Sequence, residues 1–158
     1  VEATQADLEE QFRLLLAIRD RLSETNDTIN GLRDVREQIT RWKEVTKERP
    51  DAERIAAAAD TLCEDLTAIE GQLIDVKADS PLSRPTALNV KLGTLIDFVA
   101  GADAVPTQGT KEGFGEISGR IDREIEHLES LIMVDVAAFN ALLGGAGIPS
   151  VVLPKELT

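Results

Sequence analysis

Apolar residues recur at the spacing of an α-helix in four stretches of this chain. The cleanest stretch advances in alternating steps of four and three residues through Ile55, Ala59, Leu62, Leu66, Ile69, Leu73 and Val76. Such spacing places a narrow apolar stripe on one face of a helix, where it is buried against partner helices. The pattern therefore predicts an all-α fold.

The first predicted helix runs from about Thr4 to about Glu48. Its stripe comprises Leu8, Phe12, Leu15, Ile18, Leu22, Ile29, Leu32 and Ile39, with Val35 and Trp42 at its flanks. Residues 23–31 are rich in Ser, Thr, Asn, Asp and Gly, which are poor residues for a helix interior. A kink, or a break into two helices, near Asn26–Gly31 is therefore an open alternative to one straight helix.

Proline residues mark the next helix boundaries. Pro50 ends the first helix and opens a second, because proline lacks the N–H that a helix interior needs but fits a first turn. The second helix is expected to run to about Lys77. Ser83 is the expected N-cap of a third helix, with Pro85 in its first turn. The third helix is expected to end near Gly101–Asp103.

A fourth helix is predicted after Thr107 or Thr110, either of which is suited to cap its N-terminus. Its stripe consists of Phe114, Ile117, Ile121, Ile125, Leu128, Ile132, Phe139 and Leu142. Gly144-Gly145 is expected to end the helix by supplying a left-handed turn. The apolar segment that follows is bracketed by Pro149 and Pro154, so it is expected to be extended.

Short connections between four amphipathic helices predict an antiparallel up-down-up-down four-helix bundle. Residues 1–147 are expected to form this helical bundle domain, and residues 148–158 an extended apolar tail. Because the third helix is short, one end of the bundle is expected to be a layer of two or three helices. Two helical hairpins stacked end to end along the first helix are an alternative.

The chain is acidic, with 17 Lys and Arg against 29 Asp and Glu and a net charge of −12. A field of that sign repels phosphate backbones and anionic lipid, so we expect no nucleic-acid partner. We also expect no membrane insertion, because no continuous apolar run reaches the roughly 20 residues that a span requires. The stretch Arg33–Arg49 is locally positive and is expected to lie against acidic helices or to receive an acidic partner. The oligomeric state is left open.

Catalytic and metal-binding patterns are weak. Cys63 is the single cysteine, and its place beside Leu62 favours a small buried thiol. Glu124 and His127 have the three-residue spacing of di-iron bundles, but such sites need that pair twice and the chain has one His. The sequence shows no nucleophile elbow, oxyanion hole or positioned carboxylate pair. We therefore expect no catalytic, cofactor-binding or metal-binding residue and no enzymatic activity in this chain.

Several polar residues and one tryptophan lie in or beside the apolar stripes. The residues are Arg33, Arg36, Trp42, Asn89 and Asn140. We expect the amides and guanidinium groups to cross-link helices or cap chain ends, and so to fix the register of packing. The alternative is a binding pocket, for which a space enclosed by the first and fourth helices near Trp42 and His127 is the candidate.

The order of several short motifs resembles the C-terminal helical region of large bacterial sortilin-like β-propeller proteins, which carry BNR-type repeats and are often labelled glycosyl hydrolases. The motifs are Leu32–Gln38, Arg84-Pro85 with Leu88–Leu92, Ala102-Asp103 with Pro106-Thr107, and Phe139–Leu142 with Gly147–Pro149. The resemblance implies an appended helical domain of an extracytoplasmic protein, periplasmic or secreted. It also implies that any ligand binding or hydrolysis belongs to a propeller elsewhere in the parent protein.

These observations predict a non-catalytic helical accessory or protein-interaction domain of a larger propeller protein. The chain begins at Val1 without an initiator methionine, so we expect a segment of a longer protein or a chain processed at its front. The expected partner is the propeller of the same parent chain or another protein. The alternative is a helical bundle of the sensor type that binds a small ligand or a metal.

Overall fold

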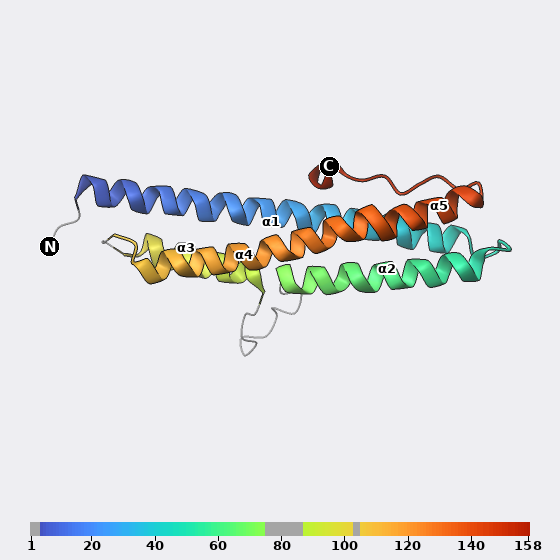
Figure 1. Ribbon diagram of the computed structural model, residues 1–158, viewed down its shortest axis with the longest axis horizontal. Helices are drawn as coiled ribbons and strands as arrows, with labels where there is room; N and C mark the ends of the chain where they lie inside the picture. The colour runs from blue at the N-terminus through green and yellow to red at the C-terminus, as the bar shows by residue number, and fades with distance from the viewer. Residues whose placement is uncertain (1–3, 75–86, 103–104) are drawn as a thin grey trace. The chain divides into compact units, whose positions relative to one another are not determined.

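The computed structural model describes residues 4–74, 87–102 and 105–158, and every regular element within these ranges is helical. The elements are α1 (Gln5–Val45), α2 (Ala52–Leu73), α3 (Leu88–Ala100), α4 (Gln108–Leu131), the π-helical turn η1 (Ile132–Val136), α5 (Ala137–Gly145) and the 3₁₀ turn η2 (Lys155–Leu157). Because α4, η1 and α5 follow one another directly, they form one helical rod (Figure 1). The predicted all-α class and its four principal helices are confirmed.

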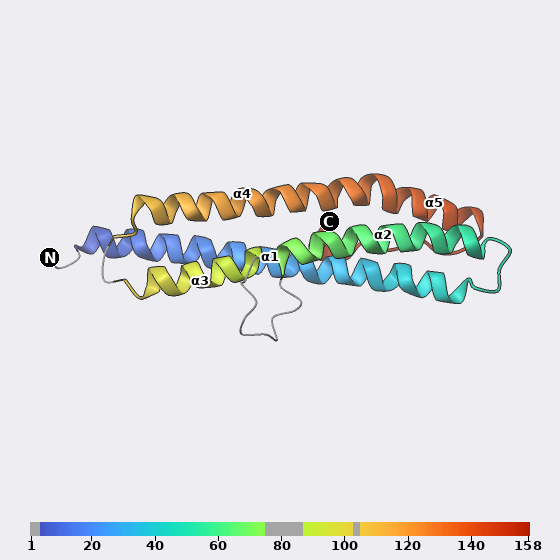
Figure 2. The same cartoon turned by 90° about the horizontal axis from the view of Figure 1, so that it is seen from below.

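The chain divides into two compact units. Unit 1 comprises Val1–Asn26 and Gly71–Arg123, and unit 2 comprises Asp27–Glu70 and Glu124–Thr158. Within unit 1, α3 runs antiparallel to its segments of α1 and α4; within unit 2, α2 runs antiparallel to α1 and α5 (Figures 1 and 2). Each short connection inside a unit therefore reverses the chain direction, as expected for an antiparallel bundle. Each unit is a bundle of three principal helical segments.

Helix α1 continues without interruption through Asn26–Gly31. Thr25 is fully buried, and its hydroxyl donates to the carbonyl oxygen of Arg21 at 2.7 Å, so its polar group is satisfied within the helix. Ile29 is also buried. Burial of this segment outweighs the weak helix propensity of its residues, and the alternative of a break into two helices is excluded.

Threonine caps begin two of the helices, of which the sequence predicted the cap of α4. Thr4 and Asp7 form a reciprocal capping box: the Asp7 N–H donates to Thr4 Oγ1, and the Thr4 N–H donates to Asp7 Oδ2 at 2.8 Å. At α4, Thr107 rather than Thr110 is the cap, because its Oγ1 accepts the Thr110 N–H at 3.2 Å. The expected cap of the third helix, Ser83, its Pro85, and the expected end of the second helix at Lys77 lie outside the described residues.

The left-handed residue that ends the last helix is Gly147, with φ 71°, and not Gly144 or Gly145 as predicted. The N–H of Ile148 donates to the carbonyl of Leu143 at 2.9 Å, and that of Gly147 donates to Gly144 at 3.0 Å. This pair of bonds is a Schellman motif, which satisfies the last carbonyl groups of the helix. The motif also turns the chain back toward the helix that it has just left.

The π-helical turn shifts the buried face of the α4–α5 rod. The buried apolar residues advance through Leu128, Leu131, Val136, Phe139 and Leu143. The five-residue step from Leu131 to Val136 spans the wider turn, in which hydrogen bonds join residues five apart. Ile132 and Leu142, which the helical pattern predicts to be core, are consequently half-buried.

The predicted stripe is wrong at the start of α1, where Leu8 and Phe12 are 47% and 61% exposed. The face that meets α3 is instead that of Gln11. Its Nε2 donates to the carbonyl oxygens of Val99 and Ala102, each at 2.6 Å. Because this amide binds the C-terminal end of α3, the flank that carries Leu8 and Phe12 is left to solvent.

Candidate functional site

Three helices packed side by side leave a groove between each neighbouring pair, and in unit 2 these grooves differ in chemistry. One lies between α1 and α2, one between α1 and α5, and one between α2 and α5. Of the residues selected from the sequence, Arg33 and Arg36 lie on the first groove and Asn140 lies on the second.

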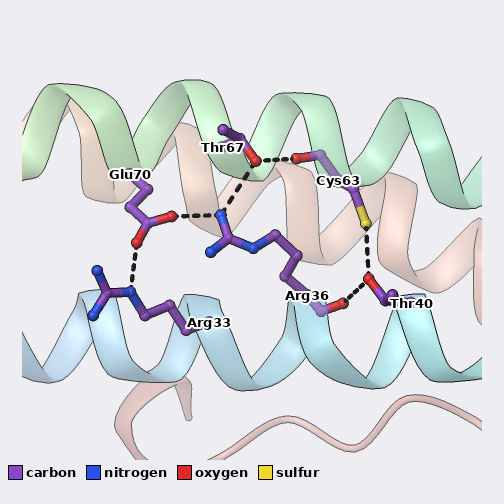
Figure 3. Close-up of polar contacts among 6 residues, drawn as sticks. All are labelled: Arg33, Arg36, Thr40, Cys63, Thr67 and Glu70. Atoms are coloured by element: carbon purple, nitrogen blue, oxygen red, sulfur yellow. Dashed lines mark hydrogen bonds and ion pairs between the residues drawn. The ribbon is translucent and has the colours of Figure 1, made fainter. Parts of the chain in front are cut away.

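The groove between α1 and α2 is bridged by a carboxylate shared between two guanidinium groups (Figure 3). Glu70 on α2 is only 3% exposed. Arg33 Nε donates to Glu70 Oε1 at 2.5 Å, and Arg36 Nη1 donates to Glu70 Oε2. Arg36 Nη1 also donates to the Thr67 hydroxyl at 3.2 Å. Arg33 and Arg36 are one turn apart on α1, so a single carboxylate fixes the register of α1 against α2.

The ionisation of Glu70 depends on these two arginines. Burial alone would raise the pKa of this carboxyl group, because it disfavours the charged form. The hydrogen bonds and positive charges of Arg33 and Arg36 outweigh burial and lower the pKa of Glu70 below its ordinary value of 4.5. The carboxyl group is therefore ionised at neutral pH.

Further along this groove, Lys43 on α1 forms an ion pair with Asp60 on α2. Cys63 is half-buried rather than buried as predicted, and its Sγ lies 3.7 Å from the Thr40 hydroxyl (Figure 3). A hollow of about 680 Å³ beside Cys63 is lined mainly by charged residues of α1: Arg33, Arg36, Glu37, Arg41 and Glu44. Opposite charges alternate along this face, which is typical of a solvated helix surface.

The groove between α1 and α5 is covered by the C-terminal tail, which runs back from the end of α5 (Figure 1). Two side-chain amides hold consecutive residues of its backbone. Asn140 Nδ2 donates to the Val151 carbonyl at 3.2 Å, and Asn140 Oδ1 accepts the Val151 N–H at 2.7 Å. Gln38 bonds both backbone groups of Val152 in the same way, each at 2.8 Å. The helices therefore bind the tail as a neighbouring strand would.

Apolar contacts complete the seat of the tail. Ile148 and Val151 are 8% and 4% exposed. Leu157 lies against Gly31 of α1 so closely that a Cβ at Gly31 would be 2.7 Å from Leu157 Cγ. Gly31 thus allows the end of the tail to approach the helix backbone, which explains a glycine inside a continuous helix.

The groove between α2 and α5 is open. Two adjoining hollows of about 420 and 350 Å³ follow it and share Arg54, Ala138 and Leu142. Leu62 and Phe139 contribute to its floor. Within the part of the chain that the structure describes, no hydrogen bond or ion pair joins α2 to α5.

The residues selected from the sequence have different positions. Arg33, Arg36 and Asn140 form the cross-links described above. Asn89 does not: it lies in the first turn of α3, and its buried Oδ1 has no hydrogen-bond partner among the residues that the structure describes. Trp42 is half-buried, and neither it nor the exposed His127 lines the hollows described above.

Sequence reasoning missed Glu70 and Gln38. Glu70 directly follows the stripe residue Ile69. A carboxylate beside a buried stripe needs a positive partner, and the two arginines one turn apart on the first helix could have indicated this pairing. No local signal marks Gln38, because its partner Val152 is remote in the sequence.

No group of three or more His, Cys, Asp or Glu side chains is placed to hold a metal among residues 4–74, 87–102 and 105–158. By length and composition alone, the helical stretch Gln108–Gly145 is long and apolar enough to cross a membrane. Only 28% of its apolar window is buried, so much of that apolar surface faces outward in the structure.

We expect loss of the two arginines to destabilise the fold more than loss of the Glu70 charge. Replacing Arg33 and Arg36 together by Ala strands a buried carboxylate and should lower the free energy of unfolding by about 3 kcal/mol or more. Glu70→Gln leaves two arginines whose side chains are 43% and 27% exposed, and should cost about 1–2 kcal/mol. Urea unfolding at neutral pH measures both values. Equal losses would contradict the assignment of Glu70 as the buried partner.

We also expect the pH dependence of stability to change sign with the arginines. In the native chain the folded state lowers the pKa of Glu70, so stability present above pH 4.5 is lost as pH falls through the folded pKa. In the double arginine variant burial should raise this pKa, so the Glu70 contribution should increase stability on acidification. The measurement is the urea midpoint from about pH 7 to about pH 3, each chain compared with its Glu70→Gln counterpart. The same sign in both backgrounds would count against this account.

The contact of Leu157 with Gly31 is testable with a matched pair of substitutions. Gly→Ala inside a helix should stabilise it by about 0.5–1 kcal/mol. Gly71→Ala in α2 meets no atom within 4 Å and should show this gain alone. Gly31→Ala must displace Leu157, so it should accelerate amide exchange at Leu157 and at Val152 while the helices remain protected. Identical tail exchange in the two variants would show that the contact is absent.

Comparison with known proteins adds no relative: no family model matches this chain, and neither a curated protein nor a solved structure is detectably similar to it.

Proposed function

We propose that this chain is a non-catalytic helical interaction module that packs as an accessory domain against a larger protein. The observation that carries the proposal is an apolar surface that unit 2 leaves uncovered on η1 and the start of α5. Met133 and Val134 are 77% and 62% exposed, and Ala137, Ala138 and Ala141 beside them are also exposed. Contiguous apolar surface of this kind is typical of interaction sites on soluble domains.

The polar clusters of unit 2 support the same proposal. Arg33, Arg36 and Glu70 join α1 to α2, while Gln38 and Asn140 hold the tail. Each of these side chains forms hydrogen bonds with another segment of the same unit. They therefore serve to hold the scaffold in one arrangement, which is what a rigid docking surface requires.

The motifs that resemble the sortilin-like propeller proteins suggest where the partner is found. If the resemblance holds, the module belongs to an extracytoplasmic protein, and the propeller of the same chain is its expected partner. Any ligand binding or hydrolysis would then be carried out by the propeller. The sequence of the complete natural protein tests this context directly, because a series of propeller repeats beside this chain supports it and their absence would contradict it.

Met133 offers a direct test of docking, because it is the single methionine of the chain. In the isolated chain its exposed thioether should be oxidised by peroxide at about the rate of free methionine. In the complete natural protein, docking should slow this oxidation at least about tenfold, since the partner excludes the oxidant. The alkylation rate of Cys63, on the groove between α1 and α2, is the internal control and should not change. Unchanged oxidation of Met133 would overturn the proposed docking surface.

A further inference from the structure

We propose that the open groove between α2 and α5 receives a basic amphipathic helix from the partner. This inference rests on the proposed interaction function and specifies the surface and the class of partner. The groove is assigned within unit 2 alone, from the residues that line it and from the state of the other two grooves.

Two of the three grooves of unit 2 are already closed by parts of the same chain. The groove between α1 and α2 is bridged by the ion pairs of Glu70 and of Lys43 with Asp60. The groove between α1 and α5 is filled by the tail, which two amides hold. At the end of the groove between α2 and α5, Arg49 of the turn before α2 donates to the carbonyl of Ala146, just after α5. Along its length this groove has no covering segment among the described residues, and no hydrogen bond or ion pair between them joins the two helices. It is therefore the face at which a fourth helix can pack against unit 2.

The shape of the groove between α2 and α5 suits a packed helix. Its walls carry small side chains, with Ala58 on α2 and Ala138, Ala141 and Gly145 on α5, above a floor that includes Leu62 and Phe139. Small residues let the axis of another helix come close, and the apolar floor accepts its buried side chains. Lining residues extend from Asp51, immediately before α2, to Asp65 in α2, which corresponds to about 21 Å of helix. That length fits a partner helix of about four turns.

The charged side chains that line the groove favour a basic partner. Three aspartates, Asp51, Asp65 and Asp135, line the groove together with one arginine, Arg54. None of these four side chains forms an ion pair within the described part of the chain. A partner helix with lysine or arginine beside its apolar seam would supply the missing opposite charges, whereas an acidic helix would be repelled by a chain of net charge −12. Complementary charge of this kind mainly determines specificity and the rate of association.

The test uses two synthetic helical peptides and the full chain. Both peptides have about 18 residues, so that they form helix on their own, and share an Ala/Leu seam. One carries lysines beside the seam and the other carries glutamates. Fluorescence anisotropy of the labelled peptides measures binding. We expect the lysine peptide to bind at least about tenfold more tightly than the glutamate peptide, and its affinity to fall as salt is added.

Matched variants locate the binding. Asp65→Lys with Asp135→Lys should weaken the lysine peptide about tenfold or more, or about 1.4 kcal/mol, and strengthen the glutamate peptide. Glu126→Lys, at an exposed residue of α4 outside the groove, should have little effect. Ala138→Gln should block both peptides by filling the groove, while Ala57→Gln, at an exposed residue of α2 that does not line the groove, should not. Circular dichroism of each variant checks that the helices are retained.

Three outcomes would overturn the inference: tighter binding of the glutamate peptide, no binding of either peptide, or equal losses in the groove variants and their controls. None of these outcomes decides the proposed function, which depends on whether Met133 is protected in the complete protein. Protection of Met133 without peptide binding would retain the interaction module and reject the helical basic partner.

Discussion

A bundle of three helices buries one stripe of each helix at its centre but leaves three grooves on its outside, and this geometric constraint shapes unit 2. Each groove exposes the flanks of two apolar stripes to water. Ion pairs bridge the first groove, and the chain's own tail covers the second. Leu62 and Phe139 remain at the floor of the third. Because two grooves are closed and the third is open, the third groove is the candidate docking surface of this unit.

The two closed grooves are held by different physical means. Glu70 is buried, and its charge is tolerated because two guanidinium groups bond it from the neighbouring helix. Buried ion pairs of this kind add little net stability over apolar packing, but a misaligned pair strands a charge, so they select one register. The tail is held by neutral amides that bond only its backbone. Such bonds do not depend on the side chains of the tail, whose apolar residues contribute burial instead.

Much of the fold was predictable from local patterns. Helical spacing identified the four principal helices and the start of α1 near Thr4, and a threonine cap located the start of α4. The π-helical turn could not be predicted, because the spacing of Ile132 and Leu142 suits an α-helix and only packing shows the shift to Leu131 and Leu143. The exposure of Leu8 and Phe12 likewise depends on where α3 ends. Local pattern does not contain that information.

The candidate site was predictable only in part. Arg33, Arg36 and Asn140 were selected because polar residues near a stripe need partners when buried, and the structure supplies those partners. Their partners Glu70 and Val151 are not identified by sequence alone, because pairing depends on which faces of the helices meet. Gly31 suggested a kink or break in α1, whereas in the structure its missing side chain lets Leu157 pack against the helix backbone. The open groove has no sequence signature, since alanine suits a buried and an exposed helix face equally well.

The most direct test of this account compares how exposed the methyl groups of the grooves are in solution. With a soluble paramagnetic probe and methyl-labelled protein, we expect strong relaxation enhancement at Ala58 and Ala138, which line the open groove. Val151 and Leu157, which lie in the groove that the tail covers, should be relaxed several-fold less. Equal enhancement at the two pairs would contradict the claim that unit 2 closes one groove with its tail and leaves another for a partner.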